Sequence, residues 1–268
     1  MKKFVVFLLL GFSLFSGVSK AEDIVGTKTI SIVADEWCPY NCDPKSDKTG
    51  FMIEIAKQVF EPKGIKIEYN IMPWERAIEE TRKGTYSAIV GAGFSDAPDF
   101  IIPTEPQGYT SNAFYIKTTS SWQYEDISSL SKVSLGVIDG YSYEKNVDEY
   151  IATNKSNPAR VQSIAGDTGL DQNFKKLEKG RITAYLENIN VAQQYISDNS
   201  LWGKFKVAGQ IVAEDKKEHY LFIAFSPTIK ESADYAAMLS EGILELRKNG
   251  KLKEILNRYN VQDWVEEE

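Results

Sequence analysis

The sequence predicts an α/β fold, because strand patterns and helix patterns alternate along the chain. A polar stretch at residues 118–131 separates two such series, as expected of a connection between two lobes. The chain has 268 residues, which suits either two lobes of ordinary size or one large domain. Composition alone does not separate these two cases.

The first series alternates strongly apolar strands with amphipathic helices. Phe51, Ile55 and Val59 recur at helical spacing, and Gly64 follows the end of that run. Gly84 ends the second helix in the same way. The strands expected in this series cover residues 29–33, 65–72 and 86–90, and the helices cover 51–59 and 74–83.

The second series also alternates strands and helices, and it begins after the polar stretch. Its expected strands cover residues 133–138, 161–164 and 182–186, with one helix opening near Ser142 and another at 170–177. An extended apolar run at 220–225 then precedes two final helices at 229–248 and 251–259. Alternating strands and helices of this kind favour parallel pairing within each lobe.

Residues 1–21 have the order of a secretory signal. Lys2 and Lys3 precede an apolar stretch at 4–15, and small residues around Ala21 form the expected cleavage site. No cysteine follows the apolar core, so no lipid anchor is expected, and no later stretch of about 18 apolar residues predicts a membrane span. The sequence therefore predicts an exported protein without a membrane anchor, and the resemblance described below places it in the periplasm.

The chain is acidic, with a net charge of -7, and removal of the lysine-bearing signal makes the remainder more acidic still. A negative protein is repelled by nucleic acid and by anionic lipid surfaces. We therefore expect neither as a partner, and a monomer is the expected state.

Cys38 and Cys42 are both exported, and their three-residue spacer in a loop predicts a local disulfide. Redox chemistry is a weaker interpretation, because thioredoxin-like motifs have two residues between the cysteines. A zinc site is weaker still, because His219 is the one histidine of the chain and is distant in sequence. We expect no metal and no cofactor.

Two tryptophans stand where predicted strands end. Trp37 follows the strand at 29–33, and Trp74 follows the strand at 65–72. If these strands are parallel neighbours, both indoles reach the carboxyl edge of the sheet, where small ligands bind in open α/β folds. The two rings are therefore candidates for a ligand clamp, and burial in the core is the alternative.

Four motifs occur in an order that resembles the family 3 bacterial solute-binding proteins. Trp37, Pro39 and Tyr40 follow the first strand, and a glycine-led segment at 84–88 precedes the third strand. The other two motifs are residues 180–184 and the final helix at 250–259. The resemblance covers nearly the whole chain after the signal.

The resemblance implies a two-lobed periplasmic binding fold, also called a Venus flytrap, with two crossover strands at the hinge. Lobe 1 would comprise residues 22–115 and 222–268, and lobe 2 would comprise 116–221. The crossing segments would lie near 114–117 and 220–225. A solute would bind in the cleft between the lobes.

The resemblance also implies where a ligand would bind. Trp37 and Trp74 fall where the family places aromatic rings, and Gly91, Ala92 and Gly93 match a loop whose backbone contacts the ligand. In lobe 2, Tyr141 and Ser142 join a strand to a helix, so the Ser142 hydroxyl and nearby N–H groups are candidates to hold a polar oxygen. Ordinary helix capping is the alternative role for Ser142.

The chain also departs from the family. Members that bind α-amino acids have an arginine just beyond the third-strand loop, whereas residues 95–100 of this chain contain no arginine. At the place of the aspartate that holds the ligand ammonium group, the chain has Asn188 with Glu187 beside it. Arg76 is a candidate replacement cation, although a helix arginine more often pairs with a neighbouring acid, here Glu79 or Glu80.

The acids near the expected cleft outnumber its cations. Asp35, Glu36, Asp99 and Glu187 are set against Arg76. Together with two indoles, these acids favour a cationic or hydroxyl-rich ligand over a dicarboxylate.

Three functions follow from the resemblance. The first is capture of a small polar solute, an amino acid or related compound, for an ABC transporter membrane complex. The second is ligand sensing for a receptor with the same binding module. The third is an enzyme similar to the cyclohexadienyl dehydratases, in which Glu187 would be the proton donor. We rank the enzyme last, because no Ser–His or Cys–His pair can be assembled from the sequence.

Overall fold

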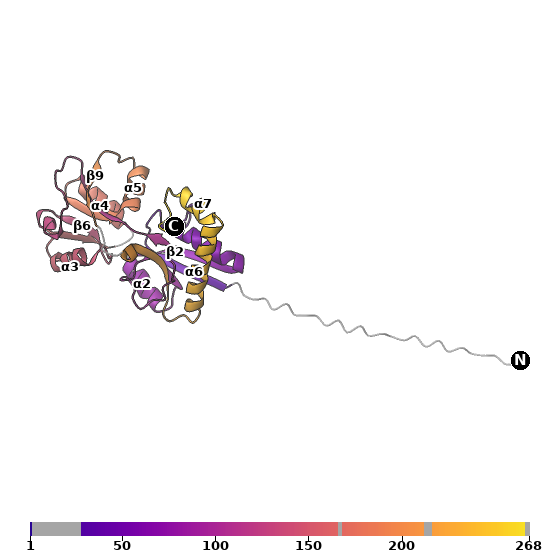
Figure 1. The fold of residues 1–268 in the computed structure, drawn as a ribbon. Helices are drawn as coiled ribbons and strands as arrows, with labels where there is room; N and C mark the ends of the chain where they lie inside the picture. Colours follow the sequence, from indigo (N-terminus) through magenta and orange to yellow (C-terminus); the bar gives the residue numbers. More distant parts are fainter. Residues whose placement is uncertain (2–27, 166–167, 212–215, 266–268) are drawn as a thin grey trace.

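The computed structural model describes residue 1 and residues 28–165, 168–211 and 216–265. These residues form two α/β lobes that lie side by side (Figure 1). Apart from Met1, the predicted signal segment lies outside the described residues. Within the described part of the chain, no helix has the length and apolarity that crossing a membrane requires.

The first lobe contains a mixed sheet in the order β2-β1-β3-β10-β4. β1 pairs in parallel with both β2 and β3, and β10 runs antiparallel to β3 and β4. The parallel pairing of β1 with β2 brings the residues that follow both strands to one edge of the sheet. The strands are β1 (Lys28–Ala34), β2 (Ile65–Ile71), β3 (Ala88–Ala92), β4 (Gly108–Tyr109) and β10 (Tyr220–Phe225).

Amphipathic helices cover this sheet. Phe51, Ile55 and Val59 are buried on one side of the first helix, as their spacing predicts. That helix packs against the two helices that end the chain (Figure 1). The helices of this lobe are α1 (Phe51–Phe60), α2 (Trp74–Arg82), α6 (Ser232–Lys248) and α7 (Lys251–Arg258), and the 3-10 helix η1 (Glu61–Lys63) follows α1.

The second lobe has a separate sheet in the order β7-β6-β8-β5-β9. β6 pairs in parallel with β7 and β8, whereas β5 runs antiparallel to β8 and β9. Its strands are β5 (Asn112–Lys117), β6 (Leu135–Ile138), β7 (Val161–Ile164), β8 (Ala184–Asn188) and β9 (Phe205–Gln210). Its helices are α3 (Lys145–Asn154), α4 (Gly169–Glu178) and α5 (Ile189–Asp198), with the 3-10 helix η2 (Ile127–Lys132).

The chain changes sheets at residues 110–111 and again between β9 and β10, where the 3-10 helix η3 (Lys216–His219) lies. The segments at 114–117 and 220–225, which we expected to cross between lobes, are instead strands within single sheets, because β5 pairs with β8 and β10 pairs with β3. The polar stretch at 118–131 is likewise part of the second lobe. Its Leu130 is fully buried in the core of that lobe.

Gly242 of α6 lies directly against Val59 of α1. A Cβ atom at position 242 would lie 2.5 Å from both γ carbons of Val59, well inside van der Waals contact. Both helices are held by the sheet beneath them, so the contact cannot widen without disturbing the core.

We therefore expect Gly242→Ala to destabilise the protein by about 1–3 kcal/mol, the usual cost of overpacking. Urea unfolding followed by circular dichroism measures this difference. Glu241→Ala, at the exposed neighbouring position, is the matched control and should change the free energy of unfolding by less than about 0.5 kcal/mol. Equal stability of Gly242→Ala and the wild type would contradict the close packing of α1 and α6.

Candidate functional site

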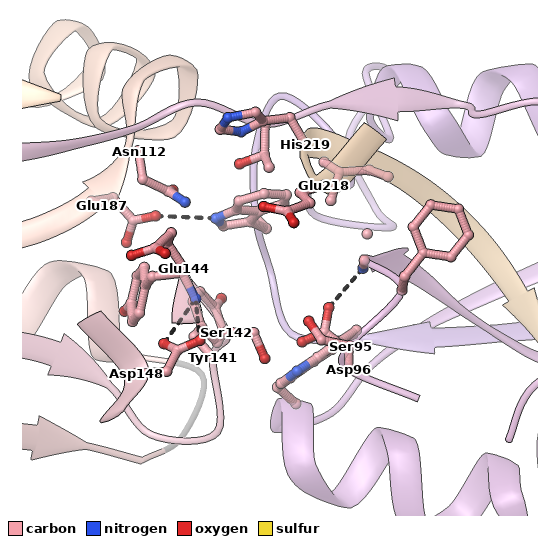
Figure 2. A pocket seen from close by; sticks show the side chains of 18 of the residues that line it. Ser95, Asp96, Asn112, Tyr141, Ser142, Glu144, Asp148, Glu187, Glu218 and His219 are labelled. Atoms are coloured by element: carbon pink, nitrogen blue, oxygen red, sulfur yellow. Dashed lines mark hydrogen bonds between the residues drawn. The ribbon is translucent and has the colours of Figure 1, made fainter. Parts of the chain in front are cut away.

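A cavity of about 760 Å³ lies between the two lobes. Its walls combine the loops that follow β1 and β3 in the first lobe with the loop that follows β6 and the end of β8 in the second (Figure 2). The side chains that line it include Asp35, Trp37, Asn41, Trp74, Phe94, Asp96, Asn112, Tyr141, Ser142, Tyr143, Glu144, Asp148, Glu187, Glu218 and His219.

Both tryptophans singled out from the sequence line this cavity. Trp37 stacks on Tyr40, with ring centroids 4.3 Å apart, and the confirmed Cys38–Cys42 disulfide closes the loop between them. Trp74 begins α2 and is 8% exposed, so most of its ring packs into the core of the first lobe. The two indoles therefore differ in role: Trp37 presents a surface to the cavity, and Trp74 supports its wall.

Glu187, at the end of β8, is a carboxylate buried where the lobes meet, with an exposed fraction of 1%. It accepts hydrogen bonds from the Tyr185 hydroxyl, the Asn188 N–H at 2.8 Å and Trp37 Nε1 at 3.2 Å. Burial raises the pKa of Glu187, and the three donors oppose that shift by stabilising the charged form. Because Trp37 belongs to the first lobe, one of these donors reaches Glu187 across the interface (Figure 2).

Tyr141 makes a second bond between the lobes. Its hydroxyl donates to the carboxylate of Asp35, which follows β1. Burial raises the pKa of Tyr141 well above its ordinary value, and the charges of Asp35 and Glu187 raise it further. The hydroxyl therefore stays protonated and acts as a donor.

Asp96 of the first lobe and Ser142 of the second both line the cavity. The carboxylate of Asp96 accepts the Gly93 N–H at 2.6 Å. Burial raises the pKa of Asp96, and the Gly93 N–H and the nearby Ser142 hydroxyl oppose the shift. The expected capping role of Ser142 falls instead to Glu144, whose side chain accepts the N–H groups of Asn146 and Val147 at the start of α3.

Asp148 lies on the first turns of α3, and its carboxylate accepts the Tyr143 N–H at 3.0 Å. Burial raises its pKa to about 6, and the negative charges of Asp96 and Glu144 contribute to the shift. Figure 2 shows Glu144 and Asp148 on the side of the second lobe and Asp96 on the side of the first. Acids from both lobes thus converge on one cavity.

Of the residues expected to bind ligand, Trp37, Trp74, Gly91, Gly93, Tyr141, Ser142 and Glu187 line the cavity. The remaining four do not. Glu36 and Arg76 are exposed outside its lining, and Ala92 is buried within β3. Asn188 is also buried, because its side-chain oxygen caps α5 and its Nδ2 donates to Tyr40 and Thr110.

Arg76 therefore does not supply the positive charge that the third-strand loop lacks. Asp99, counted among the cleft acids from the sequence, pairs instead with Arg82 on the surface at 2.7 Å. Neither Arg76 nor Asp99 is part of the cavity lining.

Sequence reasoning missed several acids of the cavity, namely Asp96, Glu144, Asp148, Glu149 and Glu218. Position 96 could have been found, because the sequence places it directly after the glycine loop that follows β3. Asp148 and Glu149 carry no local signal, since acids on a helix normally face solvent. Among the described residues, no group of three or more His, Cys, Asp or Glu side chains could hold a metal ion.

Comparison with known proteins matches residues 30–262 to the model for bacterial extracellular solute-binding proteins, family 3. The chain therefore belongs to this family, and its two lobes are the periplasmic binding fold that the sequence predicted. No curated protein matches the chain.

Solved structures share this fold at low sequence identity. An ancestral arginine-binding protein bound to arginine is 19% identical, with a TM-score of 0.69 over 86% of this chain and 97% of that one. A histidine kinase sensor domain is 17% identical, with a TM-score of 0.68 over 86% and 95% of the two chains. An amino acid ABC transporter substrate-binding protein from Streptococcus pneumoniae, bound to L-arginine, is 18% identical, with a TM-score of 0.67 over 87% and 93%.

The raised pKa of Asp148 makes stability depend on pH. The folded protein binds a proton at about pH 6, whereas an unfolded aspartate does so near pH 3.9. The bound proton stabilises the folded protein fully below the pKa that Asp148 has in the unfolded chain. This stabilisation is lost as the pH rises through about 6. We therefore expect Asp148→Asn to melt at a higher temperature than the wild type at pH 8, with the difference shrinking between pH 6 and pH 4.

Thermal unfolding followed by circular dichroism from pH 4 to pH 8 measures this difference. Asp99→Asn is a control in which the change in stability has the opposite sign, because the Arg82 guanidinium lowers the pKa of Asp99. That variant should be less stable than the wild type at pH 7, and the loss should disappear at low pH. An Asp148→Asn variant that is less stable than the wild type at pH 8 would contradict the burial of this charge.

Proposed function

We propose that this protein captures a small cationic solute, of about the size of an amino acid, in the cavity between its lobes. Carboxylates from both lobes surround the cavity, and this charge distribution is the observation that carries the proposal. Among the described lining residues, Lys145 is the one lysine or arginine, and it is exposed. Burial lowers the pKa of His219, which keeps that imidazole neutral at pH 7.

Aromatic rings support the same ligand chemistry. Trp37, Phe94 and Tyr141 line the cavity together with the acids. A cation over an aromatic face gains about 0.5–2 kcal/mol, depending on how far it is desolvated. A carboxylate would be repelled by the acids and would gain nothing from the rings, so an anionic solute is disfavoured.

Binding would be coupled to closure of the lobes. Trp37–Glu187 and Tyr141–Asp35 are hydrogen-bonded pairs with one partner in each lobe. A solute that touches both walls favours the state in which these contacts form, because it binds that state more tightly than the open one. A membrane partner could then recognise the closed form.

We further propose that the protein works in the periplasm, after export by the signal at residues 1–21, and delivers its solute to an ABC importer. Neighbours described as an ABC transporter substrate-binding protein and as a binding protein for arginine support this choice. The neighbour described as a histidine kinase sensor domain supports ligand sensing as the alternative role of the same cavity.

A thermal-shift panel tests the proposed ligand chemistry. L-arginine, L-lysine, L-ornithine and the amines formed by their decarboxylation represent cationic solutes, and L-aspartate and L-glutamate represent acidic ones. We expect at least one cationic compound to raise the melting temperature by several degrees and the acidic amino acids to leave it unchanged. Small-angle scattering with the stabilising compound should then show a smaller radius of gyration. Stabilisation by acidic amino acids alone would refute the cationic assignment.

A dehydratase-like enzyme is the second candidate, because Glu187 lines the cavity and its pKa is raised, as a proton donor requires. We expect no turnover of prephenate or arogenate, since both carry two carboxylates that the acidic cavity repels. Ultraviolet detection of the aromatic product measures turnover of either compound. Turnover that is lost in Glu187→Gln and retained in Asp99→Asn would establish the enzyme instead.

A further inference from the structure

Asp96 occupies a donor that a bound carboxylate would use. Gly93 N lies 2.6 Å from Asp96 Oδ2, and the Ser142 hydroxyl is near enough to the same carboxylate to lower its pKa. Gly93 follows β3 in the first lobe, and Ser142 follows β6 in the second. The protein therefore supplies an anion of its own between these two loops (Figure 2).

The other charged side chains of the described lining disfavour a bound carboxylate. Lys145 is exposed and stands between Glu144 and the acids Asp148 and Glu149 of the same helix. Glu218 lies on the opposite side, next to His219. An anionic group placed at any of these points would face nearby carboxylates in a partly desolvated site, where charge repulsion is strong.

The side-chain oxygen of Asn41 favours a ligand that donates hydrogen bonds. Asn41 lines the cavity and is fully buried, and its Oδ1 has no hydrogen-bond partner in the described part of the chain. Its Nδ2 donates to the Asp35 carbonyl at 2.6 Å and contacts the Tyr69 hydroxyl at 3.0 Å, which fixes Oδ1 as the acceptor. A buried acceptor without a donor is destabilising, and a donor from a ligand would relieve this.

This acceptor lies beside an aromatic face. A Cβ atom built on Gly91 would lie 3.7 Å from Asn41 Oδ1 and 3.5 Å from the Trp37 ring, so Gly91 leaves space between them. Gly91 has a positive φ of 87°, a conformation that disfavours any side chain there. An ammonium or guanidinium group at this point would donate to Asn41 and contact the Trp37 ring.

We propose that the solute is an amine or guanidine without a carboxylate group, and that Asp96 fills the position a solute carboxylate would take. This inference rests on the proposed function, the capture of a small cation between the lobes. It narrows the solute from amino-acid-like compounds to amines and guanidines such as those left when an α-amino acid loses its carboxylate.

Matched pairs of compounds test this inference by isothermal titration calorimetry on the protein without its signal. Agmatine and L-arginine differ by the carboxylate, and so do cadaverine and L-lysine. We expect the amine of at least one pair to bind more than tenfold more tightly than its amino acid. Binding of an amino acid as tightly as its amine would overturn this inference and leave the proposed function intact. Binding of none of the four would overturn the proposed function itself.

Substitutions at position 96 test whether Asp96 causes the preference for an amine over its amino acid. Asp96→Ala frees the Gly93 N–H and removes a negative charge, so we expect the preference for the amine to fall at least tenfold. Asp96→Asn keeps an acceptor for the Gly93 N–H, which preserves the loop, and should reduce the preference through loss of the charge alone. Asp99→Asn, whose wild-type side chain pairs with Arg82 outside the cavity, should leave the preference unchanged. An unchanged preference in both Asp96 variants would overturn the role of this carboxylate.

Discussion

The structure depends on a buried carboxylate that is shared between two lobes. Glu187 belongs to the second lobe, and Trp37 of the first lobe supplies one of its three hydrogen-bond donors. A carboxylate removed from water requires such donors, because its desolvation is otherwise costly. The interface that shields Glu187 from solvent therefore also supplies the Trp37 N–H that stabilises its charge.

A second hydrogen bond joins the lobes, because Tyr141 of the second lobe donates to Asp35 of the first. Asp96 of the first lobe also raises the pKa of Asp148 of the second through like-charge repulsion. The contacts between the lobes thus have a favourable part, the hydrogen bonds, and an unfavourable part, the repulsion. Under the proposed function, a cation in the cavity would reduce the repulsion and leave the hydrogen bonds in place.

Much of the fold could be predicted from the sequence, because the relevant signals are local. The alternation of Ile30 and Ile32 marks β1, and the spacing of Phe51, Ile55 and Val59 marks α1. The elements that were missed have weak local patterns. β4 contains two residues, β9 is largely half-exposed, and α5 begins directly after β8 with no turn residue between them. Asn188 permits that abrupt change, since it ends the strand and caps the helix at once.

The sequence by itself determined the α/β class, the disulfide loop and the presence of two indoles at the edge of one sheet. Each of these follows from residues that are close in the chain or from strands whose parallel pairing fixes where they end. Only the tertiary structure decided that Arg76 lies outside the cavity, that Asn188 is occupied by capping, and that Asp96, Asp148 and Glu187 share one space. The reason is physical: the charge of the cavity is the sum over loops from two sheets, and their meeting depends on how the lobes close.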